Sequence, residues 1–121
     1  MDARLREGIK LFNQGRFFES HEALESFYQD TEKANKPFIE GLVQLAAALR
    51  LYSDFGEIKG PVRMIYQALI RFENYHPSYL GIRVKELAAA MEAWAKEAET
   101  AAGKPLSSIP KIRRQVFSFF S

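Results

Sequence analysis

The sequence predicts an all-α fold, a compact bundle of about five helices. Three observations predict it. Apolar residues recur three and four positions apart along most of the chain, which is the period of a helix packed on one side. Glycine or proline separates these periodic segments, and no segment alternates apolar and polar residues between hairpin turns. The 121 residues, 47% of them hydrophobic, suit one domain with a real core.

The first two periodic segments predict a helical hairpin. An apolar stripe that begins at Leu5 marks a helix over residues 2–13, and Gly8 lies in this stripe, where a neighbouring helix can come close. Gly15 suits the left-handed position past a helix end. Because the connection is short, the next helix, over 17–30, should be an antiparallel neighbour. The pair is similar to a degenerate tetratricopeptide hairpin.

Three more helices are expected. Pro37 suits the first turn of a third helix that ends near residue 54, and its apolar residues on most sides indicate a central position. A fourth helix should run over 60–76, since the residue before Pro77 avoids the helical region. A loop over 78–81 precedes a fifth helix over 83–102.

The last segment, 104–121, differs from the rest of the chain. Prolines and serines predict an extended first part, and residues 111–120 mix basic and apolar side chains in a way that predicts one or two amphipathic helical turns. So much aromatic surface should be covered. We favour packing of this segment on the domain's own core; burial in a homodimer or at a membrane surface are the alternatives.

Composition excludes several classes of function. The formal net charge of +2 argues against a nucleic-acid partner, and the absence of cysteine excludes disulfides, thiol catalysis and cysteine metal sites. No apolar run is long enough to span a membrane, and residues 1–5 lack the pattern of a secretory signal. These features predict a soluble cytoplasmic protein with no membrane span.

Unusual polar residues lie on the second predicted helix. His21 is in the middle of its apolar stripe, and Glu25 is beside it one turn later. Glu22 lies at the flank of the stripe, and Glu19 points away from it. A histidine and a carboxylate in such a stripe are costly unless each has a partner. We therefore predict that His21 and Glu25 are largely buried and interact.

The third helix offers partners for this pair. Glu40 and Gln44 are one turn apart and share a helix face with several small residues, which mark a place where another helix packs closely. The arrangement that gives each of these polar residues a partner places the His21/Glu25 face against the Glu40/Gln44 face.

Three interpretations of this polar cluster stay open. It is a buried hydrogen-bond network that fixes helix register, or the polar floor of a ligand pocket, or a metal or acid–base site in which His21, Glu25 and Glu40 supply the ligands. The run His21-Glu22-x-x-Glu25 is similar to the two-histidine zinc helix, but its last position is Glu and not His. We favour the first interpretation and expect no metal and no cofactor.

A long motif spans the first two helices: Gly8-Ile9-x-Leu11-Phe12-Asn13-x-Gly15-x-Phe17-Phe18-Glu19-x-His21-Glu22-x-Leu24-Glu25. The third helix adds Gly41-Leu42-x-Gln44-x-Ala46-x-Ala48, and weaker similarities follow at Tyr79-x-Gly81-Ile82 and Ile109-Pro110-Lys111-Ile112. Together these resemble the signature of the domain of unknown function 309 family. The resemblance implies a compact all-helical fold and no established activity. The positions that identify the family here are Glu19, His21, Glu22, Glu25 and Gln44. The family motif commonly continues with a tryptophan where this chain has Phe27-Tyr28.

The sequence favours a non-enzymatic cytoplasmic binding or interaction module whose partner is a protein or a small ligand. The alternative is a small metal-dependent or acid–base enzyme, hydrolase-like, that uses His21, Glu22 and Glu25 together with Gln44. A cluster that opens to a cavity would favour a ligand or chemistry, whereas a sealed cluster would favour a structural role.

Overall fold

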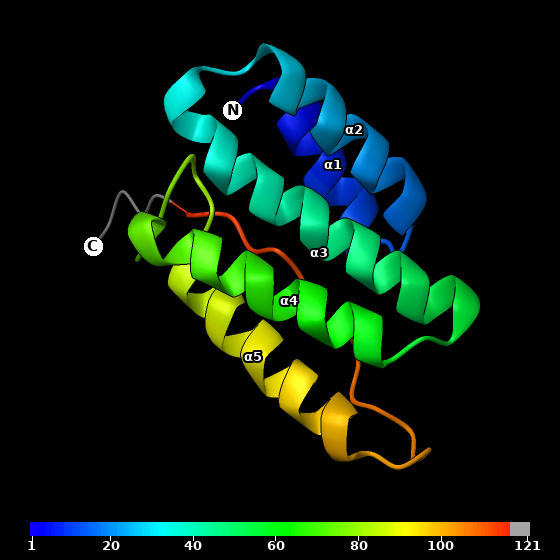
Figure 1. Cartoon of the computed structure of the whole chain (residues 1–121). Coiled ribbons are helices and arrows are strands. Elements are labelled where there is room, and N and C mark those ends of the chain that lie inside the picture. Colours follow the sequence, from blue (N-terminus) through cyan, green and yellow to red (C-terminus); the bar gives the residue numbers. More distant parts are fainter. Residues whose placement is uncertain (117–121) are drawn as a thin grey trace.

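The computed structural model describes residues 1–116 and shows a bundle of five α-helices (Figure 1). The helices are α1 (Ala3–Asn13), α2 (Phe17–Asp30), α3 (Lys36–Phe55), α4 (Lys59–Phe72) and α5 (Val84–Thr100), with short 3-10 turns at Lys33–Asn35 and Glu73–Tyr75. The only β-type pairing over residues 1–116 is two isolated bridges. The predicted all-α fold is confirmed. The fourth helix ends earlier than expected because a 3-10 turn replaces its last residues.

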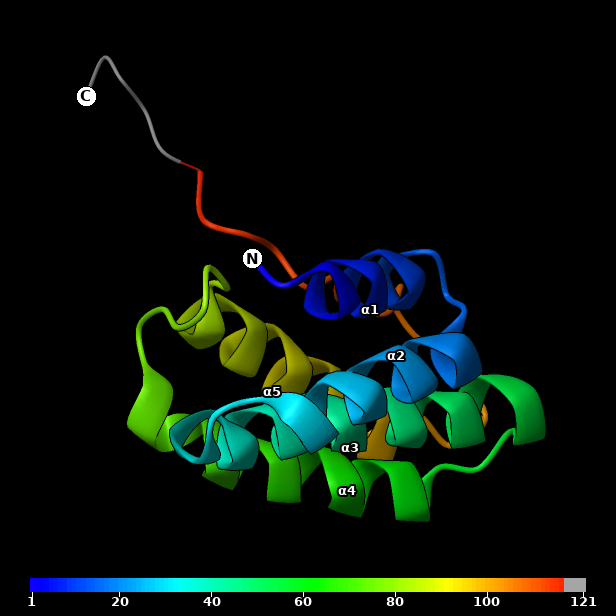
Figure 2. The ribbon, with the colours of Figure 1, turned by 90° about the horizontal axis from the view of Figure 1, so that it is seen from above.

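The helices form two layers. α2, α3 and α4 lie side by side in one layer, and α1, α5 and the C-terminal segment cover its other side (Figure 2). α3 is in the middle of the first layer and contributes eight buried residues, so its predicted central position is confirmed. One face of α2, α3 and α4 therefore points away from the core, and this outward face carries the predicted polar residues.

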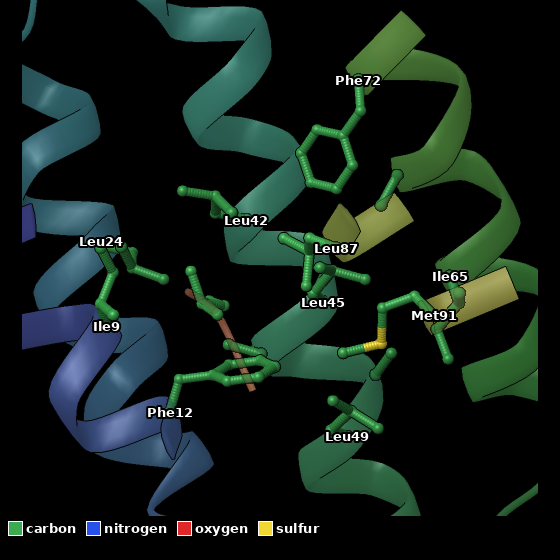
Figure 3. Packing of buried hydrophobic residues seen from close by; sticks show 14 of the residues in the cluster. Ile9, Phe12, Leu24, Leu42, Leu45, Leu49, Ile65, Phe72, Leu87 and Met91 are labelled. Carbon is green, nitrogen blue, oxygen red and sulfur yellow. The ribbon is translucent and has the colours of Figure 1, made fainter. Parts of the chain in front are cut away.

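The core between the layers is aliphatic and aromatic, and all five helices contribute to it (Figure 3). Two glycines set how closely the helices approach. A Cβ atom on Gly8 would lie 2.6 Å from Cδ2 of Leu24, and one on Gly41 would lie 2.6 Å from Cε1 of Phe72. α1 and α2, and likewise α3 and α4, pack more closely than any larger residue at these positions would allow. The close approach expected at Gly8 is confirmed.

The two ends of α1 are formed by residue types that favour helix ends, Asp2 at its start and Gly15 after its last turn. The Asp2 carboxylate accepts a hydrogen bond from the Arg4 N–H at 2.8 Å and caps α1, which lowers the pKa of Asp2. Gly15 has φ +78°, the left-handed conformation expected of it, and reverses the chain between α1 and α2. The resulting hairpin is short, and its likeness to a tetratricopeptide unit stays a prediction.

The segment after α5 returns along the covered side of the bundle. Ile112 is 2% exposed, and its N–H and carbonyl both bond to the side-chain amide of Asn13. The Arg83 N–H bonds to the Arg113 carbonyl at 2.9 Å. Residues 111–116 are thus extended where a helical turn was expected, because these backbone groups bond to α1 and to the 81–83 turn instead. The remainder of the expected helical turns, 117–120, lies outside the described residues.

Over the described residues 1–116, no helix is both long enough and apolar enough to cross a bilayer.

Candidate functional site

The predicted polar residues of α2 and α3 meet at the outward face of the first layer. Glu25, Tyr28, Glu40, Val43 and Gln44 line one hollow with a volume of about 340 Å³. Two carboxylates from neighbouring helices therefore open onto the same space. We call this the carboxylate hollow.

The expectation that His21 and Glu25 are largely buried is wrong. Their side chains are 36% and 46% exposed, and Nε2 of His21 lies 4.0 Å from Oε2 of Glu25. The physical reason is the layering: α1 and α5 cover the opposite side of α2 and α3, so the face that carries His21 stays in contact with solvent. The cluster is an open surface feature, and it makes no sealed network.

An arginine from α4 completes the cluster. Nη2 of Arg71 lies 3.3 Å from the Glu40 carboxylate, and its Nε donates to Oε1 of Gln44 at 3.0 Å. The Gln44 amide in turn contacts Oε1 of Gln67 at 3.5 Å. Gln67 and Arg71 were not among the predicted site residues. One sequence signal could have indicated this contact: Gln67 and Arg71 are one helical turn apart, and so are Glu40 and Gln44.

The two remaining candidate residues lie outside this cluster. Glu19 pairs with Arg16 at 2.9 Å, at the start of α2. The Glu22 side chain is exposed and has no ion pair or hydrogen bond with any residue of the described chain. The structure therefore brings Glu25, Glu40 and Gln44 to one hollow, with His21 4.0 Å from Glu25, and Glu19 and Glu22 lie outside it.

The cluster presents partly exposed carboxylates beside one guanidinium group. Over residues 1–116 no three His, Asp or Glu side chains are grouped closely enough to hold a metal ion. The His21–Glu25 separation of 4.0 Å is longer than a hydrogen bond, which is about 2.7–3.2 Å between nitrogen and oxygen. Carboxylates held open to solvent beside a fixed guanidinium group can instead bind complementary charges.

An exposed aromatic patch adjoins the cluster. The Arg50 guanidinium stacks over the ring of Phe18 at 4.4 Å and lies 5.7 Å from that of Phe55, and its Nε is 3.6 Å from Asp54. Phe18 is 43% exposed and Phe55 is 62% exposed. Phe18 is two helical turns from Glu25 on the same side of α2. The outward face thus combines an apolar patch with the carboxylate hollow.

A larger groove, which no local sequence pattern indicated, lies at the far end of the bundle. It has a volume of about 870 Å³ and lies between the end of α3, the start of α4, the end of α5 and the turn that follows α5. Its lining residues include Tyr52, Ile58, Lys59, Val62, Arg63, Tyr66, Ala98, Glu99, Lys104 and Leu106. Burial, and then the neighbouring Glu99, raise the pKa of the Tyr66 phenol. We call this cavity the α4–α5 groove.

A family model described as "Domain of unknown function (DUF309)" matches residues 5–64. The chain belongs to the DUF309 family. No curated protein matches the sequence. The part of this DUF309 protein that matches the family runs from α1 into α4 and contains His21, Glu25, Glu40 and Gln44. Arg71 and the α5 side of the α4–α5 groove lie outside the matched residues, as do the weaker similarities at 79–82 and 109–112.

Proposed function

We propose that this DUF309 protein is a non-enzymatic interaction module that binds a partner protein through the outward face of α2 and α3. The observation that carries the proposal is that Glu25 and Glu40, from different helices, open onto one hollow beside an exposed aromatic patch. The absence of cysteine fits a reducing compartment, and we place the module in the cytoplasm.

Charge indicates the chemistry of the partner. The outward face carries the carboxylates of Glu22, Glu25, Glu40 and Asp54 against the guanidinium groups of Arg50 and Arg71 and the ammonium group of Lys36, which lies 4.7 Å from the centre of the Tyr28 ring. Arg71 offsets the charge of Glu40, while over residues 1–116 Glu25 has only a 3.5 Å contact from the Gln29 amide and the approach of His21 at 4.0 Å. A lysine or arginine side chain of the partner in the carboxylate hollow would restore the balance.

The aromatic patch adds an apolar requirement. Phe18 and Arg50 already stack, so a partner gains apolar contact there without having to order these side chains first. Phe18 and Glu25 are seven positions apart on α2, which is about 10 Å along the helix axis. We infer that the partner presents a basic side chain and an apolar side chain at this separation, as residues seven apart on one helix would.

The enzyme alternative has less support. It requires His21 and a carboxylate to act on one substrate atom, but Nε2 of His21 and Oε2 of Glu25 are 4.0 Å apart, and over residues 1–116 Glu22 makes no hydrogen bond or ion pair with either residue. Recognition requires only that the charges stay accessible, and the exposed fractions of His21 and Glu25 meet that requirement.

A capped synthetic helical peptide with Lys and Leu seven residues apart tests the proposal. We expect saturable NMR shift changes in residues 18–28 and in the Gln44 side-chain amide. Glu25→Gln/Glu40→Gln should lower the affinity for the peptide by about tenfold, because one or two charge-assisted contacts are lost. Glu7→Gln/Glu92→Gln removes the same net charge from α1 and α5 and should bind normally. Equal binding of a peptide with Glu in place of Lys, or equal weakening by both double variants, would overturn the proposal.

A further inference from the structure

The α4–α5 groove has the features of a preformed small-ligand site. Its volume of about 870 Å³ lies within the range of about 300–1,000 Å³ typical of such pockets. Its floor is apolar and consists of Ile58, Val62, Ala98 and Leu106 with the ring of Tyr52. Because apolar surface in contact with water is unfavourable, a ligand with an apolar part would gain free energy by covering this floor.

The wall formed by the turn after α5 is held firmly in place. The Trp94 Nε1–H donates to the Ser107 carbonyl at 3.0 Å, and the Glu97 carboxylate accepts from the N–H and hydroxyl of Ser107 at 2.8 and 3.1 Å. Ala102 and Gly103 have φ values of +49° and +85°, so the chain reverses sharply at the groove. Ala102 is in a conformation that a residue with a side chain rarely adopts. The groove is therefore present before any ligand binds.

The polar groups at the mouth of the groove are mostly cationic. Among its lining residues Lys59, Arg63 and Lys104 are positive, and Glu99 alone is negative. None of these three cations makes an ion pair with a residue of the described chain, 1–116. Lys59 and Arg63 are one turn apart on α4, a spacing at which like charges destabilise a helix. An anion held between them would relieve that repulsion.

We propose that the α4–α5 groove binds a small amphipathic carboxylate, its apolar body on the floor and its carboxylate at Lys59, Arg63 and Lys104. An apolar cation would meet three like charges at the mouth, and a small polar anion would leave the floor empty. The site is independent of the carboxylate hollow, which lies on the other end of α3 and carries the opposite charge.

The protein contains its own reporter for this site. Trp94 is the single tryptophan, and its ring packs edge-on against Tyr52 of the groove at 4.9 Å between centroids. A ligand that contacts Tyr52 should change the fluorescence of Trp94. Backbone NMR shifts of residues 58–66 and 98–106 then locate the binding.

The test is a titration of the full chain with decanoate and, separately, with decyltrimethylammonium, both below the concentrations at which they form micelles. We expect saturable binding of decanoate at the groove and at least about tenfold weaker binding of the cation, the difference that one or two charge-assisted contacts supply. Arg63→Gln/Lys104→Gln should weaken decanoate binding by a similar factor. Lys10→Gln/Lys85→Gln changes the net charge equally, on α1 and at the far end of α5, and should leave binding unchanged.

A second variant tests the location without altering charge. Ala98→Leu places a larger apolar side chain where the floor now has a methyl group, and it should reduce decanoate affinity while the helical circular dichroism stays unchanged. Equal affinity for decanoate and the cation, shifts confined to other parts of the chain, or unchanged binding in both Ala98→Leu and Arg63→Gln/Lys104→Gln would each overturn the proposal.

Discussion

The side-chain amide of Asn13 is paired with the backbone of Ile112, 99 positions later in the chain. Its Oδ1 accepts the Ile112 N–H at 2.8 Å, and its Nδ2 donates to the Ile112 carbonyl at 2.9 Å. The amide thus takes the place that a neighbouring strand would have, and it holds the extended C-terminal segment against the end of α1. The Ile112 side chain is thereby inserted into the core.

Replacement of Asn13 by Ala should release this segment. Two partly buried backbone groups would lose their partner, and we expect the free energy of unfolding to fall by about 1–3 kcal/mol. Chemical denaturation measures the loss, and hydrogen exchange at Ile112 shows whether it is local. Asn74→Ala, on an exposed 3-10 turn, is the matched control. Unchanged exchange at Ile112 in Asn13→Ala would show that the amide does not hold the segment.

Gly41 should tolerate no larger residue. In Gly41→Ala the new methyl group would lie 2.6 Å from the fully buried ring of Phe72, so α3 and α4 must separate or the ring must shift, at a cost of about 1–3 kcal/mol. Gly60→Ala is the control because nothing closer than 3.8 Å meets its added Cβ. That control should be neutral or stabilising by up to about 1 kcal/mol. Thermal melting compares the two, and a Gly41→Ala protein as stable as Gly60→Ala contradicts the packing argument.

His21 should contribute little to stability. Its side chain is 36% exposed and 4.0 Å from a carboxylate that is itself half-exposed, so His21→Ala should cost less than about 1 kcal/mol. Urea denaturation at neutral pH provides the measurement. A loss several times larger would mean that the cluster is a structural network after all, and it would weaken the proposed binding role of this face.

Tyr66 should make the protein sensitive to alkaline pH. Burial and Glu99 raise its folded pKa above the ordinary value of 10.0, so the neutral phenol is favoured in the folded state. The stability that this provides is fully present below the unfolded pKa and is lost as pH rises through the folded pKa. In Tyr66→Phe this part of the pH dependence should disappear. Denaturation midpoints compared from neutral to alkaline pH test it, and parallel curves for the two proteins would refute it.

Local sequence signals were enough to place most helices. The second helix begins and ends as expected, at Phe17 and Asp30, because a glycine turn precedes it and the apolar period stops where it ends. The fourth helix was placed less well: the proline at 77 limits how far a helix can extend, but the 3-10 turn from Glu73 is set by packing at its end.

The candidate site was predicted only in part, for a different reason. Helical spacing correctly put His21 beside Glu25 and Glu40 beside Gln44, because such spacing is a property of a single helix. Whether that face is buried depends on which side the other helices cover, and α1 and α5 cover the opposite side. The presence of Arg71 in the cluster likewise follows from the way α4 packs on α3.

By itself, the sequence determined the helical class, the number and approximate bounds of the helices, the central position of α3 and membership of the DUF309 family. These depend on periodicity, caps and turns, which act over a few residues. Only the tertiary structure decided that the polar cluster is open, that residues 111–116 are extended against Asn13, and that a cationic groove exists. That groove joins residues from Tyr52 to Leu106, and no local pattern can encode a space that forms only when three helix ends and a turn meet.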